Sequence, residues 1–169
     1  MPAHGDVVTL AGLDVHEARL LRRWSPPAQT WFVDIEPRGL RAIQAVWPEA
    51  RIYHGWLHRF LATAAPIRFF HADFMGPYSQ RVADTMRAAR GRLASGAIIA
   101  LTFLRCRDGR WGQRVRDLAS EVDDPAIRRW IGTRRALEED LGVRLDVLDA
   151  FEYRRTIHSP MGSLVARVS

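Results

Sequence analysis

The sequence contains no lysine and no asparagine, and it has a single cysteine. Without lysine the chain has no P-loop, because that phosphate-binding motif ends in a lysine followed by serine or threonine. Cys106 has no second cysteine with which to form an internal disulfide, so we expect a protein of a reducing compartment. No apolar run approaches the roughly 20 residues that span a bilayer, and residues 1–10 do not resemble a signal peptide. We therefore expect a cytoplasmic protein without a membrane segment.

Two classes of enzyme site are also missing. There is no G-x-S-x-G elbow of a serine hydrolase. The six histidines have no metal-ligand spacing with cysteine or acidic residues, so we predict no metal site.

All 25 basic residues are arginine, and the net charge is +6. A basic surface attracts phosphates, but a diffuse charge is a weak indication of nucleic-acid binding.

What the sequence does contain is a regular alternation of apolar strand-like and helix-like segments. Its 169 residues, 47% of them hydrophobic, suit one domain with a substantial core. Strands are predicted at 6–13, 30–35, 50–55, 67–74 and 97–104, and a β-hairpin at 143–155 and 161–168. Helices are predicted from Asp14, from Pro37, over 56–64, after Gly76-Pro77, and from Asp124-Pro125 to Gly142, with residues 105–114 as a loop and Gly96 as the turn before 97–104.

Strands that alternate with helices form a parallel sheet covered on both faces. We therefore predict a single α/β domain over residues 1–169: a seven-stranded, mostly parallel sheet with a C-terminal antiparallel hairpin and helices on both faces. The expected buried faces of the helices comprise Leu40, Ile43 and Trp47; Val82, Met86, Ala89 and Leu93; and Ile127, Trp130, Ile131, Leu137 and Leu141.

This order of elements resembles the Rossmann-like fold of class I S-adenosylmethionine-dependent methyltransferases. In that family the first strand ends in a Gly-rich turn, the second in an acid and the fourth in a motif with Asp or Asn. The corresponding segments here are "LAGLDVHE" (10–17), "VDIEP" (33–37) and "HADFMGPYS" (71–79), with "YHGWLHRFL" (53–61) as the loop after the third strand. The resemblance implies S-adenosylmethionine as cofactor and methyl transfer as the activity.

An acid at the end of a buried strand needs a binding partner, since its desolvation is otherwise unfavourable. The resemblance implies that Asp34 or Glu36, which flank Ile35, holds the ribose hydroxyls; Asp34 is favoured because Pro37 already begins the helix. Alternatively, one of the two acids caps that helix.

The first turn has only one glycine, so the resemblance assigns the amino-acid end of the cofactor to Leu10, Ala11, Gly12 and the helix start at Asp14. Glu17 has two interpretations: it contacts the cofactor's amino group, or it forms a capping box with Asp14.

The third loop would flank the adenine. His54 and Gly55 occupy this place, and Trp56 replaces the acid that often follows the glycine, which suggests stacking on the adenine in place of a hydrogen bond. Trp56 is alternatively an ordinary core residue.

Asp73 and Phe74 end the fourth strand, beside the expected methyl group. Asp73 would orient a nucleophilic amine or hydroxyl of the acceptor, or else cap the next helix. The stretch that includes Tyr78 is loosely similar to the D/N-P-P-Y/F motif, but three inserted residues interrupt the match.

An Arg-rich segment with one tryptophan follows the fifth strand, a composition that suits phosphate and base contact. Its candidate substrate-binding residues are Arg105, Arg107, Arg110, Trp111 and Arg114. A solvated loop is the alternative.

Because no large insertion is present to recognise an acceptor, a polymeric substrate, a partner subunit or a second copy of the chain is expected to complete the site. Two other functions remain open: a non-catalytic protein that uses this fold for assembly, and an NAD-type enzyme, which the terminal hairpin disfavours.

Overall fold

Seven strands form one mixed sheet in the computed structural model, which describes residues 5–10, 15–74, 76, 78–104, 110–154 and 160–169. The strands are β1 Asp6–Leu10, β2 Thr30–Asp34, β3 Arg51–His54, β4 Ile67–Phe74, β5 Leu93–Leu104, β6 Leu145–Arg154 and β7 Pro160–Val168. The helices are α1 His16–Leu21, α2 Pro37–Val46, α3 Leu57–Thr63, α4 Gln80–Ala89, α5 Arg110–Asp117 and α6 Pro125–Leu141, with a short 3-10 turn at Pro27–Gln29.

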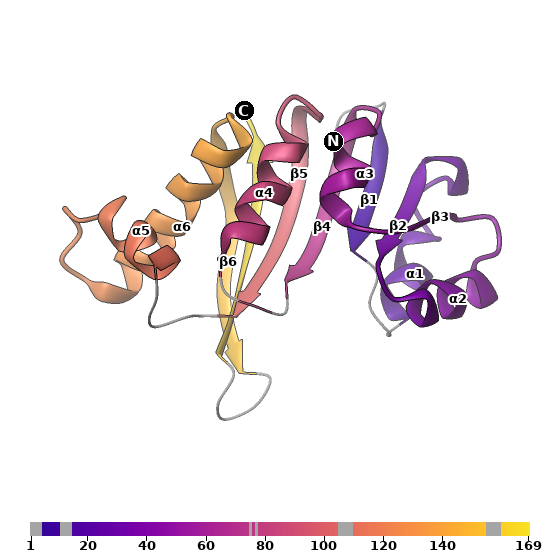
Figure 1. Cartoon of the computed structure of the whole chain (residues 1–169), viewed down its shortest axis with the longest axis horizontal. Coiled ribbons are helices and arrows are strands. Elements are labelled where there is room, and N and C mark those ends of the chain that lie inside the picture. The colour runs from indigo at the N-terminus through magenta and orange to yellow at the C-terminus, as the bar shows by residue number, and fades with distance from the viewer. Residues whose placement is uncertain (1–4, 11–14, 75, 77, 105–109, 155–159) are drawn as a thin grey trace.

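The strand order is β3-β2-β1-β4-β5-β7-β6 (Figure 1). Strands β1 to β5 are mutually parallel, and β7 is antiparallel to both of its neighbours, β5 and β6. The order of the strands reverses between β1 and β4, which is the place where open α/β sheets bind ligands. The predicted seven-stranded sheet with a C-terminal antiparallel hairpin is confirmed.

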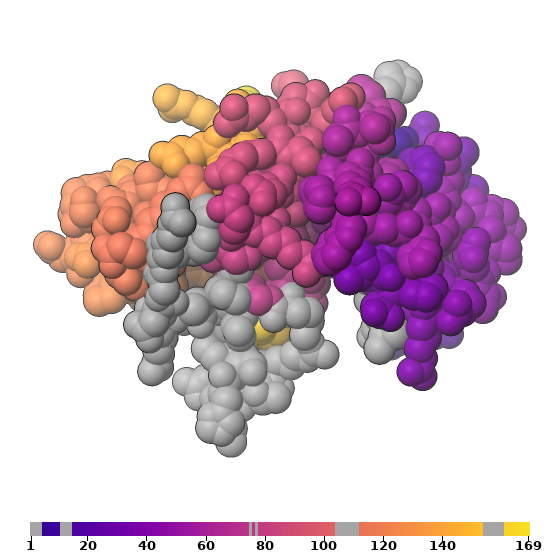
Figure 2. All heavy atoms as spheres, viewed as in Figure 1, coloured from indigo at the N-terminus to yellow at the C-terminus, as the bar shows by residue number. Residues whose placement is uncertain are grey.

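Helices cover both faces of this sheet, each with its own apolar cluster. Helices α3, α4 and α6 bury side chains against one face along its whole width. Helices α1 and α2 pack on the other face, over β1, β2 and β3. Figure 2 shows the N-terminal part, in indigo and purple, and the C-terminal part, in orange, at opposite ends of the molecule with α4 between them. None of the described helices is long and apolar enough to cross a membrane.

Several predicted boundaries agree with the structure for identifiable reasons. Pro37 begins α2, and the predicted face of that helix is buried. Helix α6 begins after Asp124, whose Oδ1 accepts hydrogen bonds from the next two free backbone N–H groups, and it ends at Gly142, which has a φ of 69°. Both ends of α6 were therefore recognisable from local sequence.

Other boundaries were wrong. Gly96 does not precede β5 but lies within it, with a φ of 76°. Between two ladder pairs, Ile67–Leu93 and Phe69–Ile98, β4 advances two residues and β5 advances five. A bulge absorbs the surplus residues, and a glycine tolerates the positive φ that this requires. Leu93 accordingly begins β5 and does not extend the buried stripe of α4.

Two helices also differ from the prediction. Helix α1 begins at His16, and its N-cap position is Val15, without a side-chain cap; Asp14 lies outside the described residues. The predicted loop over 105–114 becomes helical from Arg110 onward as α5. In α6, Ile127 is exposed and not part of the core, because it lies in the first turn beyond the edge of the sheet's apolar cluster.

Candidate functional site

The carboxyl ends of β1, β2, β3 and β4 lie at the same edge of the sheet, as parallel pairing requires. In the ladder Asp34 is opposite His54, and Thr9 is opposite His71. Asp73 follows His71 by two residues on the same strand, so the two side chains point to the same face. The residues predicted at the ends of these strands are thereby brought together, with the switch point between β1 and β4 at their centre.

Hydrogen bonds tie the turn after β2 to the end of β3. Asp34 Oδ1 accepts from the backbone N–H of Glu36 at 2.9 Å, and the N–H of Gly55 donates to the carbonyl of Asp34 at 2.8 Å. His54 Nε2 lies 3.0 Å from the carbonyl of Ile35. These bonds fix the backbone around the two acids without using the Glu36 carboxylate.

Neither acid caps α2 in the predicted way. Glu36 occupies the N-cap position, but its side chain makes no capping hydrogen bond. Asp34 accepts from the N-cap residue itself and not from the first turn of the helix. The capping alternative is therefore wrong for both residues, and Glu36 is exposed at the edge of the sheet.

Two apolar side chains in the turns after β2 and β3 are partly exposed. Ile35 is 38% exposed and Trp56 is 37% exposed, which rules out the core interpretation of Trp56. The guanidinium of Arg81 lies 4.2 Å from the centre of the Trp56 ring and covers it by a cation–π contact. The absence of a side chain at Gly55 has a local cause, since a Cβ there would lie 2.7 Å from the Tyr53 ring.

A polar cluster lies one residue before the end of β1. Thr9 Oγ1 donates to Glu17 Oε1 at 2.5 Å, and His71 Nδ1 lies 2.5 Å from the same oxygen and 3.2 Å from the Thr9 hydroxyl. Because an ionised carboxylate only accepts hydrogen bonds, Nδ1 is the donor in the pair. The predicted capping box needs Asp14, which lies outside the described residues. Ala11 and Gly12, assigned to the same turn, lie outside the described residues.

The environment of His71 favours its protonated form. Burial lowers the pKa of the imidazole, but the hydrogen bond and charge of Glu17, together with the charge of Asp73, outweigh it and raise the pKa. Sequence reasoning missed His71. The available signal was that Thr9 and His71 are polar residues inside two mainly apolar strands.

Asp73 and Phe74 end β4 beside this cluster. Helix α4 is capped by Ser79, whose hydroxyl accepts from the N–H of Val82, so the prediction that Asp73 caps this helix is wrong. Phe74 stacks on Phe103 of β5 with ring centres 5.6 Å apart and ring planes 7° apart. Because side chains alternate along a strand, Phe74 packs on the face of the sheet opposite to that of His71 and Asp73.

Tyr78 does not extend this surface. It is buried, and its hydroxyl donates to Asp140 Oδ2 of α6 at 2.5 Å. Burial and the Asp140 carboxylate raise the pKa of the phenol far above its ordinary value. The buried position of Tyr78 therefore does not support the loose similarity to the D/N-P-P-Y/F motif.

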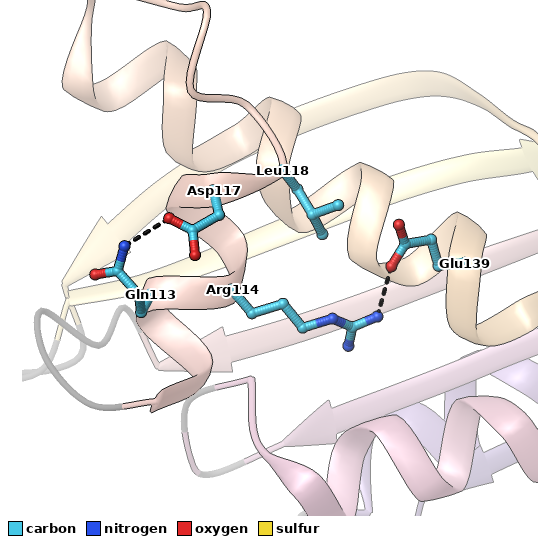
Figure 3. A pocket seen from close by; sticks show the side chains of 5 residues that line it. All are labelled: Gln113, Arg114, Asp117, Leu118 and Glu139. Atoms are coloured by element: carbon cyan, nitrogen blue, oxygen red, sulfur yellow. Dashed lines mark hydrogen bonds and ion pairs between the residues drawn. The ribbon is translucent and has the colours of Figure 1, made fainter.

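Of the five predicted substrate-binding residues, the structure describes the side chain of Arg114 alone. Arg114 of α5 donates to Asp140 and to Glu139 of α6, both at 2.8 Å, beside an open hollow of about 580 Å³ (Figure 3). Asp140 is buried and also accepts from Arg87 of α4 at 3.1 Å, so it joins three helices. Arg105 and Arg107 lie outside the described residues, as do the side chains of Arg110 and Trp111. Among the residues that the structure describes, no group of three acidic, histidine or cysteine side chains is placed to hold a metal ion.

Comparisons with known proteins establish the fold. No family model and no curated protein sequence matches the chain. Among solved structures, it is similar to the N-methyltransferase NodS from Bradyrhizobium japonicum WM9 in complex with S-adenosylhomocysteine, with a TM-score of 0.63 and 11% identity over 97% of this chain and 77% of that one.

An S-adenosylmethionine-dependent methyltransferase from Mesorhizobium loti is also similar, with a TM-score of 0.63 and 13% identity over 99% of this chain and 93% of that one. TrmN from Thermus thermophilus gives a TM-score of 0.61 and 14% identity over 99% of this chain, which spans 45% of that protein. The chain therefore has the class I methyltransferase-like fold that its sequence resembles.

Proposed function

We propose that this chain binds S-adenosylmethionine at the carboxyl ends of β1 to β4 and transfers its methyl group to an acceptor. The observation that carries the proposal is the end of β2. There, in a methyltransferase-like fold, Asp34 is followed by the exposed Ile35, and its carbonyl accepts from the N–H of Gly55, the residue before the exposed Trp56. An acid accepts the hydrogen bonds of a ribose diol, and exposed apolar groups in the adjoining turns suit a flat adenine ring.

The other residues of this edge suit the remaining parts of the cofactor. Glu17 carries a carboxylate for the ammonium group of the amino-acid end, and the backbone at Leu10 directly follows Thr9, which donates to that carboxylate. On the adenine side, His54 and Gly55 form part of the wall through their bonds to the turn after β2. These assignments support a ligand that extends from β3 across to β4.

Methyl transfer needs little chemistry from the protein beyond orientation. When bound, S-adenosylmethionine would supply an electrophilic methyl group and leave as the neutral thioether, and the methylated nitrogen or oxygen would release its proton to solvent. Asp73 would accept a hydrogen bond from the attacking N–H or O–H and aim its lone pair at the methyl group.

A nucleic acid is the acceptor that we favour. The net charge of +6 and the Arg-rich segment that follows β5 support it. Two further similar structures, from Streptococcus thermophilus and Clostridium thermocellum, are described as an rRNA methylase and a putative rRNA methylase. Because Arg114 is bound to two acids of α6, we assign phosphate contact to Arg105, Arg107 and Arg110 and not to Arg114.

Calorimetric titration with S-adenosylmethionine, S-adenosylhomocysteine and NAD tests the proposal. We expect binding of the first two ligands and none of NAD. Binding of NAD alone would favour a dehydrogenase-type enzyme. The absence of heat with all three ligands would overturn the cofactor assignment and favour a non-catalytic role in assembly. A radiolabelled methyl group on S-adenosylmethionine, followed into RNA, then tests the transfer itself.

A further inference from the structure

We infer that His71 is a positioning residue for the amino-acid end of the bound cofactor: it holds the Glu17 carboxylate through Nδ1 and loses its proton when Glu17 binds the ligand's ammonium group. This inference rests on the proposed function, and it adds a residue and a proton to the proposed site. It begins from the contacts among Thr9, Glu17 and His71, which come from three different elements of the fold.

The geometry fixes one oxygen of the carboxylate and leaves the other available. Glu17 Oε1 receives both short hydrogen bonds, from the Thr9 hydroxyl and from His71 Nδ1. Within the described part of the chain, the other oxygen, Oε2, makes no hydrogen bond. The side chains of His71 and Glu17 are 27% and 28% exposed, so a ligand can reach the pair. A carboxylate held in this way presents a fixed acceptor to an ammonium group.

The charges around His71 determine what happens when that ammonium group arrives. In the described residues, the charged groups that face the imidazole are Glu17 from α1 and Asp73 from its own strand; Thr9 on β1 and Ala100 on β5 are uncharged. The protonated imidazole neutralises Glu17 in the empty site. A ligand ammonium placed beside it adds a second positive charge, and release of the imidazole proton removes that repulsion.

The amino-acid end of the ligand is therefore expected to make binding dependent on pH. Below the pKa of His71, binding must release a proton, so affinity rises with pH by up to about tenfold per unit. Above that pKa the affinity becomes independent of pH, as long as the ligand's ammonium group keeps its own proton. A ligand without an ammonium group should not show this dependence, because nothing then competes with the imidazolium for Glu17.

Two ligands that differ only at this end test the inference. S-adenosylhomocysteine has the amino-acid portion, and 5′-methylthioadenosine lacks it. We would titrate both into the wild-type protein from about pH 5 to 7.5, where histidine titrates and the ligand's ammonium group stays protonated, in buffers of different ionisation enthalpy that report proton release. S-adenosylhomocysteine should release up to one proton and gain affinity with pH, whereas methylthioadenosine should do neither.

The variant H71Q keeps a donor for Glu17 but has no proton to lose. It should bind S-adenosylhomocysteine with no pH dependence and without proton release, and it should bind methylthioadenosine like the wild type. NMR of the wild-type protein labelled with 15N-histidine provides a second readout that needs no variant. At a pH where the free His71 ring is doubly protonated, S-adenosylhomocysteine should convert it to the singly protonated form.

The outcomes separate the two claims. Equal pH profiles for the two ligands, or a His71 ring that keeps both protons in the complex, overturn the inference and leave the proposed cofactor site intact. Failure of both ligands to bind at any pH overturns the proposed function, and this inference with it.

Discussion

At the scale of single residues, Asp34 combines a local bond with a proposed ligand contact. One carboxylate oxygen accepts the N–H of Glu36 and so shapes the turn after β2. Substitution by asparagine keeps an oxygen acceptor for that bond but removes the charge, whereas alanine removes both. The two variants therefore distinguish ligand binding from the shape of the turn.

We predict that D34N weakens binding of S-adenosylhomocysteine by about 1–3 kcal/mol, the free energy associated with a hydrogen bond to a charged group, and leaves thermal unfolding unchanged. D34A should weaken binding at least as much. Calorimetry measures the affinities, with E36Q as the matched control that removes a charge two residues away. A larger loss in E36Q than in D34N would transfer the ribose contact to Glu36.

Asp140 is the residue whose loss should affect stability most clearly. Its carboxylate is 4% exposed and accepts hydrogen bonds from Tyr78, Arg87 and Arg114. We expect D140A to lower the free energy of unfolding by about 1–3 kcal/mol, and Y78F to lower it less, because the two arginines still satisfy the acid. Urea denaturation compares the variants. A greater loss in Y78F would contradict the central place of Asp140.

The same carboxylate predicts a response to acid. Burial works to raise the pKa of Asp140, but the hydrogen bonds from Arg114 and Tyr78 outweigh it, so the pKa is lowered in the folded protein. A lowered pKa contributes stability above the ordinary aspartate range, near pH 4, and that contribution is lost as pH falls through the lowered value. The urea concentration at the midpoint of unfolding of the wild type should therefore decrease as the pH is lowered below about 4. D140N should show a smaller decline over the same interval, and equal declines would assign the acid sensitivity to other groups.

At the scale of elements, α5 and α6 cross at a glycine. A Cβ on Gly132 of α6 would lie 1.9 Å from the carbonyl oxygen of Val115 in α5. Alanine favours a helix by about 1 kcal/mol over glycine, but here it would force the two helices apart. We predict that G132A lowers the free energy of unfolding by about 1–3 kcal/mol, the usual effect of overpacking.

Thermal and urea unfolding measure this effect. G76A is the matched control, because a Cβ at Gly76 has open space around it. If G132A were more stable than the wild type, as helix propensity alone predicts, the two helices would move apart without a loss of stability, and the prediction would be wrong.

Sequence reasoning predicted well the elements whose limits are set by residues close to them in the sequence. Strand β4 has the predicted limits, and α6 has a capping aspartate at one end and a glycine at the other. Helix α5 was missed because its stabilising contacts are distant: Val115 packs on α6, and Arg114 reaches Asp140, 26 residues away. An Arg- and Gly-rich segment indicates a loop when such partners are unknown.

The same distinction applies to the site. Asp34 and Asp73 were recognisable because each acid ends an apolar run. The partnership of His71 with Glu17 was not, since 54 residues separate them and the sheet alone brings them together. Glu17 had a plausible local interpretation as a capping residue, and the distant histidine is its actual partner.

At the scale of the whole molecule, the net charge of +6 bears on the acceptor. If the acceptor is RNA, its affinity should fall steeply with salt, because each phosphate contact releases counterions. The double variant R105Q/R107Q should reduce the slope of log affinity against log salt by roughly 1–2, on the scale of about 0.7–0.9 per contact. Cofactor affinity should be unchanged.

R114Q provides the matched control for this test. Because Arg114 joins α5 to α6, its replacement should lower stability and leave the salt slope as in the wild type. Filter-binding of RNA over a salt series gives the slopes. No RNA binding even at low salt would exclude nucleic acid as the acceptor, and a small molecule would then take its place.

The position of β7 has a consequence for how the chain folds. It is the last of the seven strands in sequence, yet it lies between β5 and β6. Until residues 160–168 leave the ribosome, the 12-residue β5 has an unpaired edge and β6 has no neighbour. Each of the strands β2 to β5 has an earlier strand to pair with as it emerges. The joining of β6 to the rest of the sheet requires β7 to insert between β5 and β6. The longest apolar strand of the sheet is thus the segment of a nascent chain most in need of protection by a chaperone.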